Sequence, residues 1–337
     1  MSDPPDAGNT VTLMRRARNV ARSAAAAWER MRPGRFGVLA FHRVDTSCHD
    51  PWGLAVSPQH FDEQLIALHE IGTIVPLDRA LEISVASRFR SLRPQFAMTF
   101  DDGYVDNLRH AVELLERHDA TATVFVATGY LDRPSFWWDV FASFVLESRA
   151  TPAGLVRTAE RIGLITAAQA AETVGCDRLV VHDQLYEALV RRPNEEILAI
   201  LDEMADDAGV VLPTPVQRPL TTAELVELAS HPLVTIGAHT ASHPRLTCLT
   251  PEERRAEILE GDQRLNELIG RQSRVFAYPY GNTDAAVTDV VRQCGFRYAV
   301  TTEPRWVGLR EDPLLLPRLP VPDLDDASFR DWLWRSG

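Results

Sequence analysis

The sequence predicts an α/β fold: a distorted (β/α)7–8 barrel interrupted by a helical insertion. Short apolar runs that resemble buried strands alternate with amphipathic helical stretches along most of the chain. This alternation is typical of a parallel sheet, and about seven or eight repeats favour a barrel. One long stretch in the middle of the chain, 138–218, has no such strands and predicts the insertion.

The first half of the barrel is expected to contain three strands and two helices. The strand-like runs are apolar or β-branched and cover 37–41, 95–100 and 121–128. Ser57-Pro58 is typical of a helix start, a capping residue followed by proline in the first turn, and this helix should reach residue 70. The second helix is expected over 104–118, where leucine and valine recur on one face.

The second half resumes the alternation after the interruption. Thr250-Pro251-Glu252-Glu253 combines a capping box with proline in the first turn and predicts a helix that runs to Gly270. A further helix is expected over 284–294, and a last extended run, 314–321, is broken by prolines. Strands are expected at 234–238, 275–278 and 298–301.

One barrel domain, 36–322, therefore accounts for most of the chain. A basic helical segment, 1–35, is expected before it and a C-terminal tail, 323–337, after it. The insertion, 138–218, is rich in alanine, leucine, glutamate and arginine, and 194–208 reads as an amphipathic helix. The insertion contains no recognisable motif, so a cap, a partner surface and a solvated helical excursion all remain open.

Composition excludes some classes of protein. A net charge of −12 over 337 residues argues against a nucleic-acid partner. The four cysteines are scattered without C-x-x-C spacing, which fits a reducing compartment. No segment has the apolar core of a signal peptide, and none reaches the ~18–20 apolar residues of a membrane span. We therefore expect a cytoplasmic protein.

The N-terminal segment 11–35 carries seven arginines and one glutamate. A basic helix of this kind can lie on an anionic membrane surface, which would place the protein peripherally at the inner face of the membrane. The alternative is a solvated helix that packs one side on the barrel.

Two acidic residues, Asp101 and Asp102, stand directly after an expected strand and before Gly103. Functional groups of α/β barrels gather where strands end, and the glycine would allow a sharp turn at the mouth. Adjacent carboxylates repel each other unless a cation or a proton separates their charges. An Asp-Asp-Gly turn without further function is the alternative.

A second group, His239 and His243, follows the strand expected at 234–238. Their spacing would bring both imidazoles to one side of a turn. Two histidines and one aspartate form a ligand set that suits Zn²⁺ and also tolerates Co²⁺, Ni²⁺ or Mn²⁺. Three protein ligands leave a position for water or substrate, as in catalytic sites.

Together these segments resemble the polysaccharide deacetylases with a NodB-homology domain, also called carbohydrate esterase family 4, and their exopolysaccharide deacetylase branch. The family pattern T-F-D-D-G is present at 99–103, and H-[ST]-x-x-H-P is present at 239–244. The third pattern, R-x-P-[YF], stands here as Ala277-Tyr278-Pro279-Tyr280. The resemblance covers about 36–137 and 219–322 and implies a barrel of the deacetylase type.

The resemblance also implies roles for these residues. Asp101 would be the general base, and Asp102 would bind a divalent metal ion together with His239 and His243. The backbone N–H of Tyr280 would stabilise the oxyanion of the reaction. A further group would have to protonate the departing amine.

Two departures from the family pattern concern Asp101 and the general acid. The arginine that holds the base aspartate in the family is replaced by Ala277, and Arg318, in Pro317-Arg318-Leu319-Pro320, is our expected substitute. The C-terminal leucine-x-histidine pattern that supplies the acid is absent, because no histidine follows His243. His42, at the end of the first strand, is the expected acid, and a buried structural histidine is the alternative.

Aromatic residues near these motifs could present flat faces to a sugar. Tyr104 is the favoured candidate because it directly follows the Asp-Asp-Gly turn, and Tyr280 is another. Trp137 and Trp138 are more typical of a hydrophobic core.

The function that follows is metal-dependent removal of an N-acetyl group from an N-acetylhexosamine glycan or its lipid- or nucleotide-linked precursor, in surface polysaccharide biosynthesis. The alternatives are another C–N hydrolase of the same fold, an inactive carbohydrate-binding module, and a scaffold acting through the insertion. A degenerate module would be expected to lose Asp101 or a metal ligand, and none is lost here.

Overall fold

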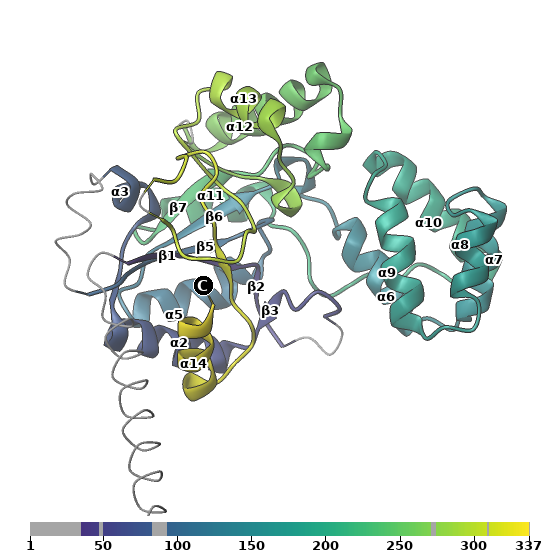
Figure 1. The fold of residues 1–337 in the computed structure, drawn as a ribbon, viewed down its shortest axis with the longest axis horizontal. Helices are drawn as coiled ribbons and strands as arrows, with labels where there is room; N and C mark the ends of the chain where they lie inside the picture. Colours follow the sequence, from purple (N-terminus) through teal and green to yellow (C-terminus); the bar gives the residue numbers. More distant parts are fainter. Residues whose placement is uncertain (1–34, 47–49, 83–92, 271–273, 309, 337) are drawn as a thin grey trace, which may run out of the picture.

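The computed structural model describes residues 35–46, 50–82, 93–270, 274–308 and 310–336. Its centre is a parallel sheet that curls into an incomplete barrel, with helices on its outer face (Figure 1). β4 (Thr73–Ile74) pairs with the first half of β5, outside the main strand order. That order is β10 (Leu319–Pro320), β1 (Phe36–Phe41), β5 (Gln95–Phe100), β6 (Ala122–Val126), β7 (Val234–Ala238), β8 (Val275–Ala277) and β9 (Tyr298–Val300).

The extended run 314–321 joins the two edges of this sheet. Leu319 pairs in parallel with Leu39 of β1, while Leu316 forms a parallel bridge with Val300 of β9. Proline has no N–H for a ladder, so Pro317 and Pro320 keep this last segment short and irregular. The predicted α/β barrel is confirmed, in the form of a curled sheet closed by one irregular segment.

The alternation of side chains along the strands produces two separate apolar layers. One layer fills the space enclosed by the sheet and contains Val38, Ala97 and Phe125, with helix α3 (Leu77–Glu82) packed against it. The other lies between the sheet and the outer helices and contains their strand neighbours, such as Leu39 and Met98. Successive strand residues point to opposite faces, so every second residue of β5 points into the barrel.

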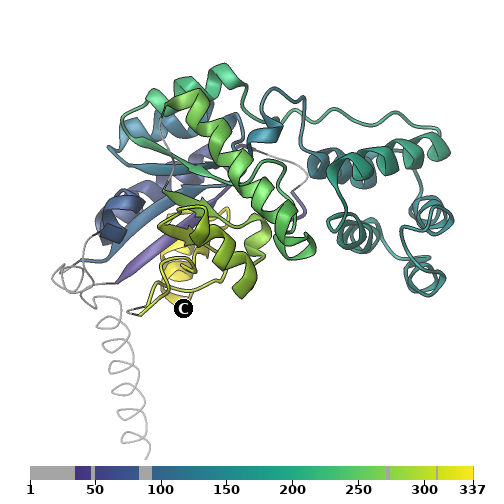
Figure 2. The same ribbon diagram turned by 90° about the horizontal axis from the view of Figure 1, so that it is seen from above.

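Helices cover the outside of the sheet, as Figure 2 shows from above. Their apolar sides bury residues of the outer layer. They are α2 (Pro58–Ile71), α5 (Val112–Arg117), α11 (Thr222–Ser230), α12 (Pro251–Ile269), α13 (Ala285–Gln293) and α14 (Asp326–Arg335). Helix α14 occupies most of the expected C-terminal tail, and its Phe329 and Leu333 are fully buried in the main core beside α2.

The helix expected over 104–118 is shorter than predicted. Its first residues instead pair with the chain that returns from the insertion: the Val105 N–H donates to the Arg218 carbonyl, and the Leu220 N–H donates to the Gly103 carbonyl. Helical structure begins with a π-helical turn, η1 (Asn107–Ala111), that leads into α5. Tertiary pairing has overridden the local helical pattern at this position.

The segment 138–218 forms a helical lobe beside the barrel (Figure 1). Its apolar core also includes Tyr104, Ala127 and Tyr130 of the barrel, so the lobe packs directly on the carboxyl ends of β5 and β6. Between lobe and barrel lies a small two-stranded sheet, β2 (Arg43–Val44) and β3 (Ala55–Val56). The helices are α6 (Trp137–Glu147), α7 (Pro152–Arg161), α8 (Ala167–Thr173), α9 (Arg178–Leu189) and α10 (Asn194–Ala208).

The N-terminal segment, membrane spans and disulfides can be judged only from the described residues. The basic segment 1–35 lies outside them except for its last residue, so its predicted helix and membrane contact stay predictions. Among the helices that are described, none combines the length and the apolar character required to cross a membrane. The three described cysteines, Cys176, Cys248 and Cys294, form no disulfide.

Candidate active site

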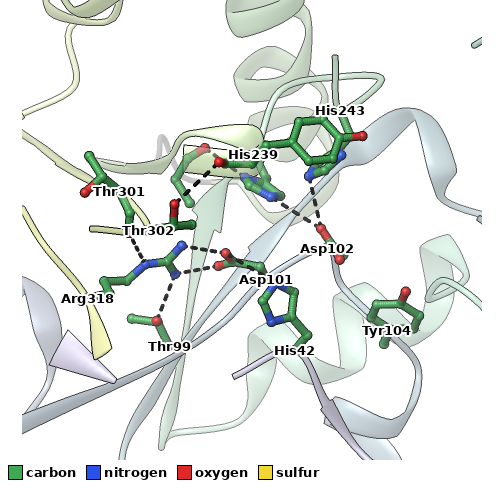
Figure 3. Close-up of polar contacts among 12 residues, drawn as sticks. His42, Thr99, Asp101, Asp102, Tyr104, His239, His243, Thr301, Thr302 and Arg318 are labelled. Atoms are coloured by element: carbon green, nitrogen blue, oxygen red, sulfur yellow. Dashed lines mark hydrogen bonds and ion pairs between the residues drawn. The ribbon is translucent and has the colours of Figure 1, made fainter. Parts of the chain in front are cut away.

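The predicted site residues come together at the carboxyl ends of the strands (Figure 3). Asp101 continues the alternation of Ala97 and Thr99, so it follows these residues toward the inside of the barrel. Asp102 breaks the alternation with a left-handed φ of 71°, and Gly103 follows with a φ of 84°. This turn separates the two carboxylates, which therefore have different partners.

Arg318 holds Asp101 with two parallel hydrogen bonds. Its Nη1 and Nη2 donate to the two carboxylate oxygens at 2.7 and 2.6 Å, the Nη1 also donates to Thr99 Oγ1, and the Nε donates to the Thr301 carbonyl (Figure 3). The guanidinium is fully buried. Bidentate pairing fixes both the position and the ionisation of a carboxylate. Arg318 thus makes the contact that the sequence predicts for the arginine missing at Ala277.

Asp102 faces two imidazole nitrogens. Its Oδ1 lies 3.4 Å from His239 Nε2 and 3.3 Å from His243 Nε2, and one ligand atom from each of the three residues lies within 4.8 Å of the others. His239 Nδ1 bonds the Ala277 carbonyl, which leaves Nε2 directed at the site. In the described part of the chain this is the only such group of potential metal ligands.

The donor set fits a divalent metal ion. One carboxylate oxygen and two imidazole nitrogens converge where no described arginine or lysine pairs with Asp102, and all three residues are buried. Burial lowers the pKa of His243 to about 3, so this imidazole is a neutral ligand at physiological pH. Such a set is typical of a catalytic Zn²⁺ site with three protein ligands.

Electrostatics keep both aspartates ionised. Burial opposes ionisation of each carboxyl, but the guanidinium of Arg318 more than offsets it and lowers the pKa of Asp101. The pKa of Asp102 is also lowered despite burial, through the charge and hydrogen bonding of His243 and His239. The two carboxylates are therefore available as base and ligand rather than as a shared-proton pair.

The loop that carries the histidines is held in a strained conformation. Thr240 and His243 have left-handed φ angles of 64° and 59°, and strained residues of this kind gather at functional sites. Glu257 of α12 accepts hydrogen bonds from the Ser242 N–H and Oγ. Gly261, one turn further, lies so close that a Cβ there would be 2.5 Å from the Thr240 carbonyl carbon. Helix α12 thus fixes the loop from behind.

His42 lies on the open side of Asp101. Its Nε2 is 4.0 Å from Asp101 Oδ2, and its side chain is 23% exposed. This position differs from that of a buried structural histidine and leaves the ring within reach of a bound substrate. His42 is held at its backbone, where its carbonyl accepts a hydrogen bond from Asn107 Nδ2.

Tyr280 borders the site at the end of β8. It has a left-handed φ of 59°, and its ring meets the His243 ring edge to face at 4.5 Å. The neighbouring N–H groups of Gly281 and Asn282 bond Tyr278 and Pro279, whereas the Tyr280 N–H has no acceptor among the described residues. A free N–H donor beside the ligand set is the feature required of an oxyanion donor.

The expectation that Tyr104 faces a sugar is wrong. Tyr104 is fully buried; its hydroxyl donates to Asp139 Oδ2 at 3.0 Å and accepts from Trp138 Nε1 at 2.8 Å. The ring of Trp138 in turn packs on the His243 ring at 4.9 Å. Tyr104 therefore supports His243 through Trp138 instead of facing a substrate. Trp138 belongs to the hydrophobic core.

Sequence reasoning missed the contribution of the helical lobe. Asn194 Nδ2 donates to the Ser242 carbonyl and to Tyr130 Oη, so α10 touches the histidine loop. Arg245, just after this loop, pairs with Glu187 of α9 at 3.0 Å. The only sequence signal was the run Trp137-Trp138-Asp139 at the start of the lobe. Nothing in this run indicates which residues it contacts.

These features together define a hydrolytic site. A carboxylate fixed in its charged form, a group of three potential metal ligands and a partly exposed imidazole lie at the barrel mouth, and Tyr280 packs beside His243. They are the groups required to activate water, to stabilise negative charge on a carbonyl oxygen and to protonate a leaving group.

Comparison with known proteins agrees with this site. The family profile "Polysaccharide deacetylase" matches residues 91–164 and 182–299, which is more than half of the chain. The chain therefore belongs to the polysaccharide deacetylase family, as the motifs predict. Asp101, Asp102, His239 and His243 lie within the matched residues, whereas His42 and Arg318 lie outside them.

A curated relative, YxkH of Bacillus subtilis (strain 168), is 26% identical over 111 residues. The match covers 33% of this chain and 39% of YxkH, so the chain matches about two fifths of its relative's length. PplD of Streptococcus pyogenes, solved in complex with acetate, has a TM-score of 0.56 at 16% identity and covers 90% of this chain and 98% of its own.

IcaB of Ammonifex degensii also has a TM-score of 0.56, at 19% identity, with 90% of this chain and 97% of IcaB covered. The similarity to IcaB and PplD is structural and shows a shared fold. The barrel is therefore of the deacetylase type.

Proposed function

We propose that this protein is a metal-dependent carbohydrate N-deacetylase, which hydrolyses the N-acetyl group of N-acetylhexosamine units in a glycan or glycan precursor. The observation that carries the proposal is the buried Asp102–His239–His243 set beside an Asp101 clamped by Arg318. Family membership supports the reaction class.

Zn²⁺ is the metal that best suits one carboxylate and two imidazoles, and Co²⁺, Ni²⁺ or Mn²⁺ are compatible with the same set. Asp102, His239 and His243 would hold it. When bound, such an ion lowers the pKa of water and polarises a carbonyl group.

The chain's own residues supply the proton transfers. Asp101 accepts a proton from the attacking water, and Arg318 keeps its carboxylate ionised and aimed. The Tyr280 N–H donates to the acetamide oxygen as negative charge develops there. His42 Nε2 donates a proton to the amine nitrogen as the C–N bond breaks, which releases acetate and the free amino sugar.

The biological setting belongs to the same proposal. We propose that the substrate is a lipid-linked, nucleotide-linked or polymeric sugar of surface polysaccharide biosynthesis, met in the cytoplasm at the inner membrane face. The arginine-rich segment 11–35 would bind the anionic lipid. Replacing Arg15, Arg16 and Arg18 by glutamate in the full chain should then lower binding to anionic vesicles. Equal vesicle binding of the two proteins would contradict membrane contact.

The central test combines metal analysis with acetate release. The purified protein should contain about one divalent ion and should release acetate from at least one member of a panel of lipid-linked, nucleotide-linked and polymeric N-acetylhexosamines. A bound metal without acetate release would favour another C–N hydrolase of the same fold. Sugar binding with neither metal nor acetate release would favour an inactive carbohydrate-binding module.

A further inference from the structure

A second cavity lies at the junction of the barrel and the helical lobe. Its volume is about 370 Å³, at the small end of the ~300–1,000 Å³ range of small-molecule pockets. Its walls come from residues 45–46 and 50–54 between β2 and β3, from α6 and from residues 213–217 of the chain that returns from the lobe. A cavity of this size suits about one sugar unit.

Arg43 is buried in the wall of this cavity, close to several carboxylates but with one donor unmet. It is 4% exposed, its Nε has no acceptor among the described residues, and its Nη2 lies 3.5 Å from Asp45 Oδ2. A buried guanidinium normally has its donors satisfied, because a buried donor without an acceptor destabilises the folded state. Nε itself is closed to solvent, so a ligand in the cavity would be bound through the outer N–H groups of the guanidinium, where Nη2 makes only the long contact to Asp45.

Acceptors and an aromatic wall complete the lining. Asp139 is 8% exposed, and its Oδ2 accepts the Tyr104 hydroxyl. Gln217 Nε2 donates to Asp45 Oδ2 at 3.1 Å, so both side chains are oriented at the cavity edge. Trp52 contributes an indole that packs on Tyr186 of α9 at 5.1 Å.

The mixture of one guanidinium and several carboxyl groups in the lining favours a neutral ligand over a charged one. A metal cation is disfavoured, because Arg43 lies among the carboxylates and these acids form no ligand group of the kind found at Asp102. An anion would meet Asp45, Asp50 and Asp139. A neutral polyol satisfies both charges, since each hydroxyl can accept from a guanidinium and donate to a carboxylate.

The cavity is also coupled to the catalytic centre. Arg43 directly follows His42, and its Cζ lies 5.6 Å from the centre of the Tyr104 ring. Tyr104 is two residues from Asp102, and its hydroxyl connects Asp139 with Trp138, which packs on His243. These buried side chains form a wall between the cavity and the metal site, so a glycan would reach the cavity by passing over residues 42 and 43, where His42 is partly exposed.

We propose that the cavity lined by Arg43, Trp52, Asp139 and Gln217 is a remote saccharide subsite, which binds an uncharged sugar unit of the same glycan whose N-acetyl group lies at Asp101 and Asp102. The inference builds on the proposed function but concerns binding rather than chemistry. It implies that the enzyme acts on a chain of sugars and that its kcat/KM is higher on a longer chain than on a single sugar.

The test compares two tryptophan substitutions on the returning chain. Thr214→Trp would fill the rim of the cavity, whereas Val211→Trp, at a residue that is 91% exposed and outside the lining, is the matched control. Arg43→Met removes the buried donors in a third variant. The probes are N-acetylglucosamine and its pentasaccharides, one β-1,4-linked and one β-1,6-linked.

For Thr214→Trp and Arg43→Met, the ratio of kcat/KM on pentasaccharide to that on monosaccharide should fall about tenfold, the effect of one or two lost hydrogen bonds. Val211→Trp should keep the wild-type ratio. An unchanged ratio in Thr214→Trp overturns the subsite, as does an equal loss in Val211→Trp.

Calorimetric titration separates this inference from the proposed function. Each change is placed in Asp101→Asn protein, in which hydrolysis should be too slow to disturb the titration, and the pentasaccharide Kd should rise about tenfold with Thr214→Trp. If wild-type protein releases no acetate but this shift in Kd appears, the proposed function fails and the subsite stands. Absence of pentasaccharide binding, or binding of inorganic phosphate or Mg²⁺ that Thr214→Trp abolishes, overturns the subsite.

Discussion

Asp101 and Asp102 are neighbours in sequence, and both are buried, yet their surroundings have little in common. Both oxygens of Asp101 accept hydrogen bonds from one guanidinium, which is itself fixed by Thr99 and Thr301. Asp102 forms no ion pair with a described arginine or lysine and faces the Nε2 atoms of His239 and His243.

The difference shows how one turn gives two identical side chains different partners. The left-handed φ of Asp102 sends its carboxylate away from Arg318 and toward the histidine loop. A carboxylate paired with arginine has a fixed charge and direction, as a base requires. A carboxylate that faces two imidazole nitrogens and has no arginine or lysine partner is suited to an added cation, as a metal ligand is.

The largest effect is expected from Asp102→Ala. This change removes one of three protein ligands, so the protein should lose its bound metal and all measurable turnover. Metal content by mass spectrometry and acetate release measure the two losses. Retention of a full metal equivalent by Asp102→Ala would contradict the ligand role.

Asp101→Asn should separate the two carboxylates most clearly. The amide cannot accept a proton, so turnover should fall by ~10²–10⁴-fold, while the metal content stays that of the wild type. Asp202→Asn, at an exposed position of α10, is the control and should change neither quantity. Loss of metal in Asp101→Asn would show that the two roles are not divided as proposed.

His42→Ala tests the proposed proton donor, which lies on the exposed side of Asp101. The change removes the proposed proton donor but none of the metal ligands, so metal content should be unchanged and turnover should fall by ~10²-fold or more. Acetamides with a better leaving amine should lose less, because they depend less on protonation. Near-normal turnover on a sugar substrate would dismiss the acid role.

Arg318→Met should act on stability as well as on turnover. It leaves the buried carboxylate of Asp101 without its partner, and breaking a buried pair in this way costs ~3–5 kcal/mol of unfolding free energy. Urea denaturation measures the cost. Arg335→Met removes a surface ion pair of α14 and should cost less than ~1 kcal/mol; equal losses in the two variants would contradict the clamp.

The smallest effect concerns Asp139, a third buried carboxyl, which accepts a bond from a neutral tyrosine. Burial raises its pKa to about 7, only partly opposed by Arg43. A raised folded-state pKa means that unfolding free energy falls as the pH rises from about 3.8 to about 7 and then levels. Asp139→Asn should remove this fall, measured by urea denaturation across that range; an unchanged pH profile would contradict the shift.

Much of the fold could be predicted from the sequence because its signals are local. Strand β5 and helix α12 are each predicted by their own residues. β5 is an apolar run, and α12 begins with a capping box and a proline. The segment 104–106 was predicted as helix but pairs with 218–220, and no local pattern can reveal a partner more than a hundred residues away. Helix α14 was expected to be a tail, although its cap at Asp325 and buried Phe329 define an ordered helix.

The sequence by itself predicted which residues gather at the site, Asp101, Asp102, His239 and His243, because the Asp-Asp-Gly and His-x-x-x-His patterns each lie within a few residues of a strand end. Only the tertiary structure decided what supports them: Arg318 reaches Asp101 across 217 residues of chain, and the lobe fixes the histidine loop through Trp138 and Asn194. The reason is physical. A turn is specified by its own backbone, whereas a buried charge is satisfied by whichever side chain the folded barrel places beside it.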